Sequence, residues 1–250
     1  MIELRHLSYS YQLGESNEIK AVSEIDLQIN QGEFIVLLGA NGSGKTSLLN
    51  LIAGTLKPQE GKIIADGQDV TQLKEHKRCK WIARLFQNPL QGTAPDLSIL
   101  ENFRLASLRS KRKGLTIGTG EKFRKIVQDH VSQLGLGLES KLDQPVGALS
   151  GGQRQAMTLS MAVMDDAKIL LMDEPTAALD PKTSEIFMKL ATRIIEERKL
   201  SCLFITHQLK DALNYGGRVI QLESGKIIRD IQGDKKKKLS LPELFLWFGQ

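Results

Sequence analysis

Cysteine and long apolar runs are both scarce in this sequence. The only two cysteines, Cys79 and Cys202, lie far apart and form no CxxC pair. This excludes a disulfide framework and a cysteine-ligated zinc site, and it predicts a reducing compartment. No apolar run approaches the roughly 18 residues that a membrane-spanning helix needs. The first residues, "MIELRHLSYSY", contain no long apolar stretch, so we expect neither a secretory signal nor a membrane span.

The composition is otherwise that of an ordinary globular protein. Of the 250 residues, 41% are hydrophobic and 25% are charged, which allows a sizeable core in one large domain or two modest ones. The net charge of +5 is compatible with binding to nucleic acid, anionic lipid or nucleotide phosphates. It is equally compatible with a role in solubility alone.

The hydrophobic pattern predicts an α/β fold with a mainly parallel sheet. Continuous apolar runs at 34–38, 169–172 and 202–205 indicate strands that are buried on both faces. Two helices are predicted between them, one ending at Gly54 and one capped by Asp180 with Pro181 in its first turn. The second helix is expected to bury one apolar stripe, made of Ile186, Phe187, Leu190, Ile194 and Ile195. Strands alternating with helices are typical of a parallel sheet.

The remaining segments predict additions to this core. The stretches "EIDLQI" and "GKIIADG" predict an antiparallel β edge, and residues 89–165 read as an inserted helical subdomain. We therefore expect a single domain with an α/β core at 1–88 and 166–226, a helical subdomain at 89–165 and a C-terminal tail at 227–250. Two basic stretches, at 109–114 and 235–238, are expected to be solvated or to contact anionic lipid. The segment "LPELFLWF" is too short to span a bilayer, and we expect it to pack on the domain or on a partner.

A glycine-rich loop follows the first predicted strand. The segment "GANGSGKT" matches G-x-x-x-x-G-K-[ST] at every fixed position and stands between a strand and a helix. Its backbone N–H groups and the start of the helix suit a phosphate chain, Lys45 can reach the β and γ phosphates, and the Thr46 hydroxyl can hold Mg²⁺. The expected ATP-binding residues of this loop are Gly39, Ala40, Asn41, Gly42, Ser43, Gly44, Lys45, Thr46 and Ser47.

Two acidic residues end the second predicted strand. Asp173 suits a Mg²⁺ partner, and Glu174 can polarise an attacking water molecule. Two adjacent carboxylates next to one Mg²⁺ favour hydrolysis of the nucleotide over its storage.

The segment "LSGGQ", at 149–153, completes a resemblance to a known family. With the glycine-rich loop and the acidic pair, it makes residues 1 to about 230 similar to the ATPase subunits of ABC transporters. The resemblance implies a P-loop NTPase with a RecA-like core that dimerises head to tail. The signature residues Ser150, Gly151, Gly152 and Gln153 would then face the γ-phosphate held by the other copy. Taken alone, Ser150 and Gln153 also match a helix capping box, S-x-x-Q.

The same resemblance implies roles for further residues. Gln87 would contact Mg²⁺ and the attacking water, and His207 would contact the γ-phosphate. Asp180 would lie in a loop at the dimer interface, although Ala177 stands where the family often has serine. Tyr11 would stack on the adenine, with Tyr9 as a close competitor. His6, His76 and His130 show no ligand spacing and are expected to fill surface or core positions.

The predicted function is ATP hydrolysis that drives a transporter. Catalysis is assigned to Glu174, His207 and Gln87, and Mg²⁺ to Thr46, Gln87 and Asp173. A homodimer forms on ATP binding and acts on a separate transmembrane permease at the cytoplasmic face of the membrane.

A finer resemblance concerns the cargo. Residues 66–103 and the lysine-rich end look like importer ATPases that work with a substrate-binding protein and a permease similar to branched-chain amino acid permeases. This points to uptake of an amino acid, an aromatic one included, or of a similar small solute.

Two other classes of ABC ATPase stay open. One is an ATPase of an exporter or of a lipoprotein-release system, whose motifs are the same. The other is a soluble ABC ATPase acting on nucleic acid or ribosomes. That class usually has two ATPase domains or a long coiled-coil insertion, and this sequence has one P-loop and no heptad arm. We therefore expect no nucleic-acid partner.

Overall fold

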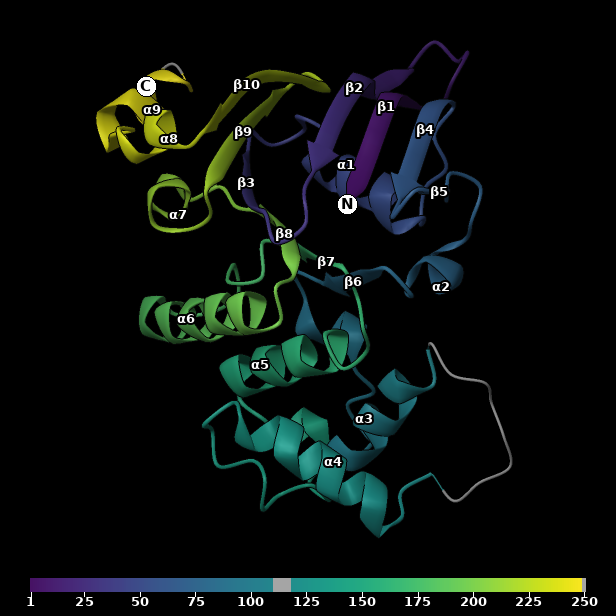
Figure 1. Ribbon diagram of the computed structural model, residues 1–250, viewed down its shortest axis with the longest axis vertical. Coiled ribbons are helices and arrows are strands. Elements are labelled where there is room, and N and C mark those ends of the chain that lie inside the picture. The colour runs from purple at the N-terminus through teal and green to yellow at the C-terminus, as the bar shows by residue number, and fades with distance from the viewer. Residues whose placement is uncertain (110–117, 249–250) are drawn as a thin grey trace.

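A six-stranded, mainly parallel sheet runs through the middle of the molecule (Figure 1). The computed structural model describes residues 1–109 and 118–248. All neighbouring strands pair in parallel except the last two, β9 and β10, which are antiparallel. In spatial order the strands are β10 (Lys226–Gln232), β9 (Arg218–Glu223), β3 (Phe34–Leu38), β8 (Ser201–Ile205), β7 (Ile169–Asp173) and β6 (Ile82–Leu85). The predicted α/β fold is confirmed.

Both faces of this sheet are buried, which explains the continuous apolar runs. In β3, Ile35 and Leu37 belong to one hydrophobic core, and Val36 and Leu38 belong to the other. Successive side chains of a strand point to opposite faces, so a strand covered on both sides needs apolar residues throughout. The apolar side chains of helix α1 (Lys45–Ala53) pack in the core that contains Ile35 and Leu37.

The antiparallel strands form a sheet of their own. Its order is β2 (Ile19–Ile29), β1 (Ile2–Tyr11), β4 (Glu60–Ala65) and β5 (Gln68–Asp69). The segment "EIDLQI" lies in β2, and "GKIIA" of the second segment lies in β4; both strands pair with β1 instead of extending the parallel sheet. The apolar side chains of these strands share a core with α1 and the main sheet, so that α1 lies between the two sheets.

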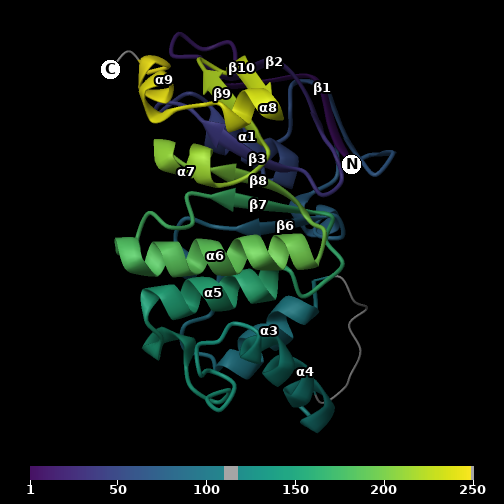
Figure 2. The same ribbon diagram turned by 60° about the vertical axis from the view of Figure 1, so that its left-hand side comes forward.

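Helices cover the opposite face of the main sheet. Helix α6 (Pro181–Glu197) and helix α5 (Gly151–Ala162) lie side by side beneath the strands (Figure 2). Asp180 caps α6, because its side chain accepts a hydrogen bond from Thr183 N at 3.1 Å. The expected stripe of α6 is buried except for Ile186, which is 52% exposed because it lies at the edge of the stripe.

A further helical layer lies beyond α5. It contains α3 (Ile99–Ser107), α4 (Glu121–Ser132) and the short 3₁₀ turns η1 (Pro89–Gly92) and η2 (Val146–Ala148). Helices α3 and α4 and the turn η2 have a core of their own, to which α5 contributes Met157 and Met161. The other side of α5 contributes Ala156 and Leu159 to the core beneath the main sheet. These helices lie within the range predicted for the helical subdomain.

The C-terminal segment packs on the main sheet. Beyond β10 lie α8 (Asp234–Lys237) and α9 (Leu241–Leu246), next to α7 (Leu209–Asn214). Leu244 is fully buried, and the Trp247 carbonyl accepts a hydrogen bond from Gln221 Nε2 at 3.0 Å. Of the four lysines, Lys236 is buried and donates to Leu213 O at 2.9 Å. Residues 227–232, which the sequence assigned to the tail, belong to strand β10.

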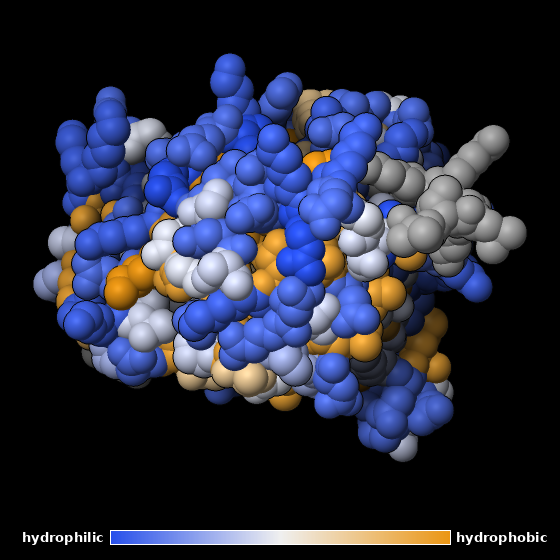
Figure 3. Space-filling view, turned by 90° about the horizontal axis from the view of Figure 1, so that it is seen from below, coloured by the Kyte–Doolittle hydropathy of each residue, from blue (hydrophilic) through white to orange (hydrophobic). Residues whose placement is uncertain are grey.

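The described surface shows no continuous apolar face on the side of the helical layer. Apolar side chains there form small patches among hydrophilic ones (Figure 3). Among the described residues, no helix is both long and apolar enough to cross a membrane. Of the basic stretch 109–114, Arg109 donates to Met161 O, and the other residues lie outside the described ranges.

One buried cation ties α1 to the short helix α2 (Glu75–Arg78). Arg78 is fully buried and donates to the carbonyls of Leu51, Ile52, Thr71 and Leu73. Burial lowers the pKa of Arg78 to about 10, and Asp69 partly offsets this effect. The guanidinium thereby donates to two carbonyls in the last turn of α1, where backbone donors are scarce, although Leu51 O also accepts from Gly54 N at 3.2 Å.

Replacing this cation should destabilise the fold. Arg78→Met leaves buried carbonyls without donors, and we expect a loss of about 3 kcal/mol in the free energy of unfolding. Urea denaturation followed by circular dichroism measures it. Lys77→Met, at an exposed position of the same helix, is the control and should change little. Equal stability of the two variants would show that Arg78 does not hold α1.

Candidate functional site

The ends of four parallel strands bring the candidate residues together. The glycine-rich loop follows β3, Gln87 follows β6, Asp173 ends β7 and His207 follows β8. Because these strands run in the same direction, their carboxyl ends lie at one edge of the sheet, where α/β proteins bind ligands.

The loop at 39–46 is held in shape by close packing. Gly44 has φ 101°, and a Cβ atom there would lie 2.0 Å from Ala21 O. A Cβ atom on Gly39 would lie 2.5 Å from Leu222 O. Only glycine fits these two positions, since one needs a left-handed backbone and both need close approach. The strand, loop and helix predicted from the sequence are confirmed.

Lys45 is buried inside this loop. Its Nζ donates to Gly39 O and Ala40 O, both at 2.9 Å. Burial lowers the pKa of Lys45, while Glu174 and Asp173 partly offset the effect. The ammonium group therefore lies at the centre of the loop with two carbonyls that a phosphate oxygen can replace.

Asp173 is the buried carboxylate of the site. The Thr46 hydroxyl donates to its Oδ1 at 3.4 Å, and Arg84 Nη2 lies 3.9 Å from its Oδ2. Burial raises the pKa of Asp173, while the nearby Arg84 opposes this effect. The structure thus brings together two of the three expected metal-binding residues, Thr46 and Asp173.

Glu174 and His207 face each other. His207 Nδ1 lies 3.2 Å from Glu174 Oε2. Glu174 has φ 44°, a backbone conformation that non-glycine residues rarely adopt and that is common at functional sites. The turn that contains His207 is held by Thr206, whose hydroxyl donates to Asp211 at 2.7 Å and accepts from Gln208 N at 3.0 Å.

Gln87 and Tyr11 lie at the rim of the site. Gln87 is exposed just beyond β6, and the preceding residue, Phe86, accepts a hydrogen bond from Gln155 Nε2 at 3.3 Å. Tyr11 is 38% exposed, and its hydroxyl lies 3.1 Å from Ser47 Oγ. Tyr9 packs edge-on against Tyr11 at 5.0 Å between ring centroids and is more buried. Tyr11 is therefore the better placed of the two tyrosines for a planar ligand above the loop.

The "LSGGQ" segment contains the start of α5, where Ser150 and Gly151 are exposed, while Leu149 is buried. Ser150 Oγ accepts from Gln153 N at 3.3 Å, and Gln153 Oε1 accepts from Ser150 N at 3.1 Å, which is a complete capping box. A Cβ atom on Gly152 would lie 2.3 Å from Thr183 Cγ2 of α6. The tip of α5 consequently packs beside the tip of α6, which Asp180 caps.

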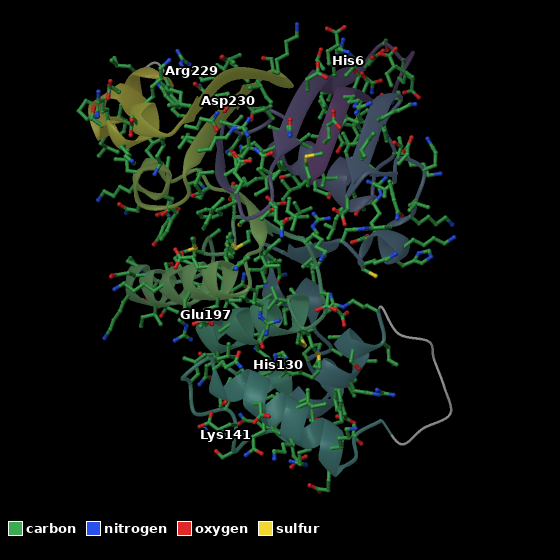
Figure 4. All side chains as sticks on the ribbon, viewed as in Figure 1. His6, His130, Lys141, Glu197, Arg229 and Asp230 are labelled. Atoms are coloured by element: carbon green, nitrogen blue, oxygen red, sulfur yellow. The ribbon has the colours of Figure 1, made fainter. Side chains whose placement is uncertain are left out.

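His6 and His130 are separate from this site, whereas the exposed His76 lines the same cavity as Arg84. His6 on β1 and His130 on α4 lie at opposite ends of the molecule (Figure 4). His130 packs near Phe103, at 6.3 Å between ring centroids. Among the described residues, no group of three His, Cys, Asp or Glu side chains is arranged to hold a metal.

The comparison with known proteins matches this arrangement. The ABC transporter family matches residues 22–177, which contain the glycine loop, the "LSGGQ" segment and the acidic pair. The chain belongs to the ABC transporter family. Its members of this type are ATP-hydrolysing subunits, and this chain is one of them.

Several relatives cover nearly the whole chain. The "Tyrosine transport ATP-binding protein" of Clostridioides difficile (strain R20291) is 38% identical over 98% of this chain and 97% of its own length. The "Lipoprotein-releasing system ATP-binding protein LolD" of Syntrophotalea carbinolica is 31% identical over 91% of this chain and 96% of its own length. Among solved structures, the ATP-binding cassette MJ0796, described as dimeric and bound to ADP and Pi, has a TM-score of 0.79. It is 31% identical and covers 93% of this chain and 98% of its own.

Two features of the site were not predicted from the sequence. Arg84 beside Asp173 is one, although a charged residue within the apolar stretch "IARL" signals a buried partner. The hydrogen bonds of Thr206 with Asp211 and Gln208 are the other, and the pattern of apolar residues gives no sign of them.

The close contact between Gly152 and Thr183 predicts that only glycine is tolerated at position 152 without loss of stability. Gly152→Ala should lower the free energy of unfolding by about 1–2 kcal/mol, because the new methyl group meets Thr183. With Thr183→Ser, which removes Cγ2 and keeps the hydroxyl, the same change should cost nothing, since alanine is the better helix former. Urea denaturation of the single and double variants measures both effects.

The neighbouring glycine is the control. A Cβ atom on Gly151 would lie 3.5 Å from Leu179 Cδ2, an ordinary contact, so Gly151→Ala should leave stability unchanged. An equal loss in the free energy of unfolding on Gly152→Ala in the wild-type and the Thr183→Ser backgrounds would contradict this explanation. In that case, the contact with Thr183 does not explain why residue 152 is glycine.

Proposed function

We propose that this ABC ATPase powers the uptake of an aromatic amino acid, or of a closely similar small solute, through a separate membrane permease. The observation that carries the proposal is the 38% identity, over 98% of the chain, to a protein whose name specifies tyrosine transport. The finer resemblance of residues 66–103 to importer ATPases supports the same cargo class. Such a system would include a substrate-binding protein outside the membrane.

Lipoprotein release is the second candidate function. The relative named for it covers a similar share of the chain, but its identity is lower, at 31%. Relatives named for phosphonate import, at 32%, and for an energy-coupling factor transporter, at 30%, are equally distant. The difference in identity favours amino-acid uptake.

In the proposed mechanism the glycine loop holds the phosphates of ATP. Lys45 Nζ exchanges the carbonyls of Gly39 and Ala40 for phosphate oxygens, and the N–H groups of the loop surround the phosphate chain. The α1 helix adds the positive end of its dipole. Tyr11, next to Ser47, stacks on the adenine. The loop is formed before ATP arrives, so little ordering is needed on binding.

The site fits a magnesium ion that is shared with the phosphates. Thr46 and Asp173 offer oxygen donors 3.4 Å apart, and such donors, completed by phosphate oxygens and water, are what Mg²⁺ prefers. We assign its binding to Thr46, Asp173 and Gln87. When bound, the ion would neutralise charge on the phosphates.

Glu174 is the proposed general base. Its carboxylate is held by the contact with His207 and by the unusual backbone conformation, so it can orient a water molecule toward the γ-phosphate. His207 is mostly exposed, at 56% of its side chain, and can also reach the γ-phosphate. Both residues act through position, which is the main source of catalysis in phosphoryl transfer.

A second copy of the chain would complete the site. Ser150 and Asp180 lie at adjacent exposed helix tips, and the first N–H groups of α5 have no partners inside the helix. The solved structure of MJ0796 in a dimeric form bound to ADP and Pi supports this assembly. We propose that ATP bridges two copies, each offering its Ser150 helix tip to the nucleotide of the other.

The permease would contact a groove next to Gln87. Two adjoining cavities, of about 730 and 440 Å³, share Glu75, Arg84, Phe86 and Arg109. They lie between the α/β core and the helical layer. A movement of these two parts on dimer closure would therefore reach a permease bound in this groove. We place the subunit at the cytoplasmic face of the membrane.

Loss of the general base should trap the dimer. Glu174→Gln should bind ATP, reduce hydrolysis at least 100-fold and give a dimer in size-exclusion chromatography with ATP and Mg²⁺. Glu197→Gln, at an exposed position of α6, is the control and should hydrolyse ATP normally. Near-normal turnover in Glu174→Gln would remove Glu174 as the base.

The cargo can be tested in the cell that encodes the chain. Deletion of its gene should abolish high-affinity uptake of labelled tyrosine, and the wild-type chain, but not Glu174→Gln, should restore it. Purification of the tagged chain from membranes should recover a permease of many helices. Normal tyrosine uptake in the deletion strain, together with retained lipoproteins, would favour lipoprotein release instead.

A further inference from the structure

Arg84 is a mostly buried cation between two parts of the site. It lies in β6, where its Cα pairs with that of Leu171 in β7, and its side chain is 12% exposed. Charged residues are seldom buried without specific partners, because removal of a charge from water is costly. Its Nε atom is buried with no hydrogen-bond partner among the described residues, so stability alone is a poor reason for an arginine here.

On one side, Arg84 faces the carboxylate of Asp173. Its Nη2 lies 3.9 Å from Oδ2, while Oδ1 accepts the hydrogen bond from Thr46. The two oxygens therefore face different groups, and this favours one rotation of the carboxylate. In that rotation, the oxygen on the Thr46 side is the one that would face a bound nucleotide.

On the other side, Arg84 is stacked on Phe86. The guanidinium carbon lies 4.6 Å from the ring centroid, and Phe86 immediately precedes Gln87. Nη1 also donates to Thr55 Oγ1 at 3.4 Å, and that hydroxyl donates to Glu75 at 3.0 Å. A planar guanidinium can pair with a carboxylate and stack on a ring at the same time, which a lysine cannot do as well.

We propose that Arg84 is a positioning residue for the magnesium–nucleotide site. This inference rests on the proposed function, because it assigns a task toward the metal bound by Thr46, Asp173 and Gln87. Arg84 orients the carboxylate at the end of β7 and fixes the segment after β6 that carries Gln87. It acts through these residues and does not touch the nucleotide.

The experiment compares nucleotide affinity with and without magnesium. A fluorescent ATP analogue is titrated into the full chain in EDTA and then over a range of Mg²⁺ concentrations. Arg84→Met should bind the analogue in EDTA as the wild type does, because the glycine loop is intact. The Mg²⁺ concentration at half-effect should rise about tenfold, as is usual when a residue behind a metal ligand is lost. Arg84→Lys, which keeps the charge, should recover part of this shift.

Folding is checked separately by urea denaturation in EDTA without nucleotide. Replacement of a buried ion pair by apolar groups is often neutral for stability, but removal of one partner is not. Should Arg84→Met fail to fold, Arg84→Gln takes its place, with the same expected shift in Mg²⁺ dependence. Arg5→Met, which breaks the exposed pair with Glu3 on β1, is the control and should change nothing.

Two outcomes distinguish failure of the proposed role of Arg84 from failure of the proposed magnesium site. A Mg²⁺ requirement that is unchanged or lowered in Arg84→Met, with a Mg²⁺-dependent wild type, overturns the role of Arg84 alone. A wild-type chain whose affinity does not depend on Mg²⁺ overturns the proposed metal site, and the role of Arg84 with it.

Discussion

Parallel pairing of four buried strands is the constraint on which the site depends. The register places Asp173 beside Ile205, and Leu37 beside Ile205 on the other flank, so that β3, β8 and β7 end at the same level. Both faces of these strands are buried. A one-residue shift in the register of a strand would therefore move each of its side chains to the opposite face of the sheet and into the other core. The position of the Asp173 carboxylate relative to the glycine loop is therefore set by the packing of apolar residues far from any ligand.

This constraint has an electrostatic consequence, since it buries charges at the strand ends. Lys45 is compensated by carbonyls of its own loop, and Asp173 by Arg84 and Thr46. Each partner lies next to the charge that it compensates, and phosphate oxygens can replace the carbonyls around Lys45. Charged groups that are already held in place need no reorganisation at the moment of reaction, which is the condition for electrostatic catalysis.

The sequence predicts the features that depend on local residue patterns. It does not predict features that depend on contacts between residues far apart in the chain. The strands at 34–38, 169–172 and 202–205, the glycine loop and the cap at Asp180 follow from short-range rules, and they are present. Strand β10 was assigned to the tail because most of its residues are exposed and it lacks an apolar run. Arg84 and Asp173 lie far apart in sequence, so only the pairing of β6 with β7 reveals their contact. The roles of Gln87, His207 and Tyr11 came from family resemblance, and the geometry at those positions is compatible with them.

The tip of α5 shows how packing and function meet in one segment. Gly152 is required by the contact with Thr183, and Ser150 is required by the capping box, so both residues have reasons within the monomer. The same close contact sets two helix starts side by side, but they differ in charge. The α6 start carries the carboxylate of Asp180 as its cap, whereas α5 has a neutral cap and no acidic residue in its first turn.

The positive end of α5 consequently has no compensating carboxylate within its own first turn. Arg154 adds to it, since its guanidinium is held nearby by the carbonyls of Val146, Gly147 and Leu149. An exposed helix start with free N–H groups and no acidic neighbour of its own favours an anion. The monomer has no need of such an arrangement for folding, because an acidic residue in the first turn would stabilise α5 further. The absence of that residue supports the proposal that this helix start binds a phosphate group held by a second copy of the chain.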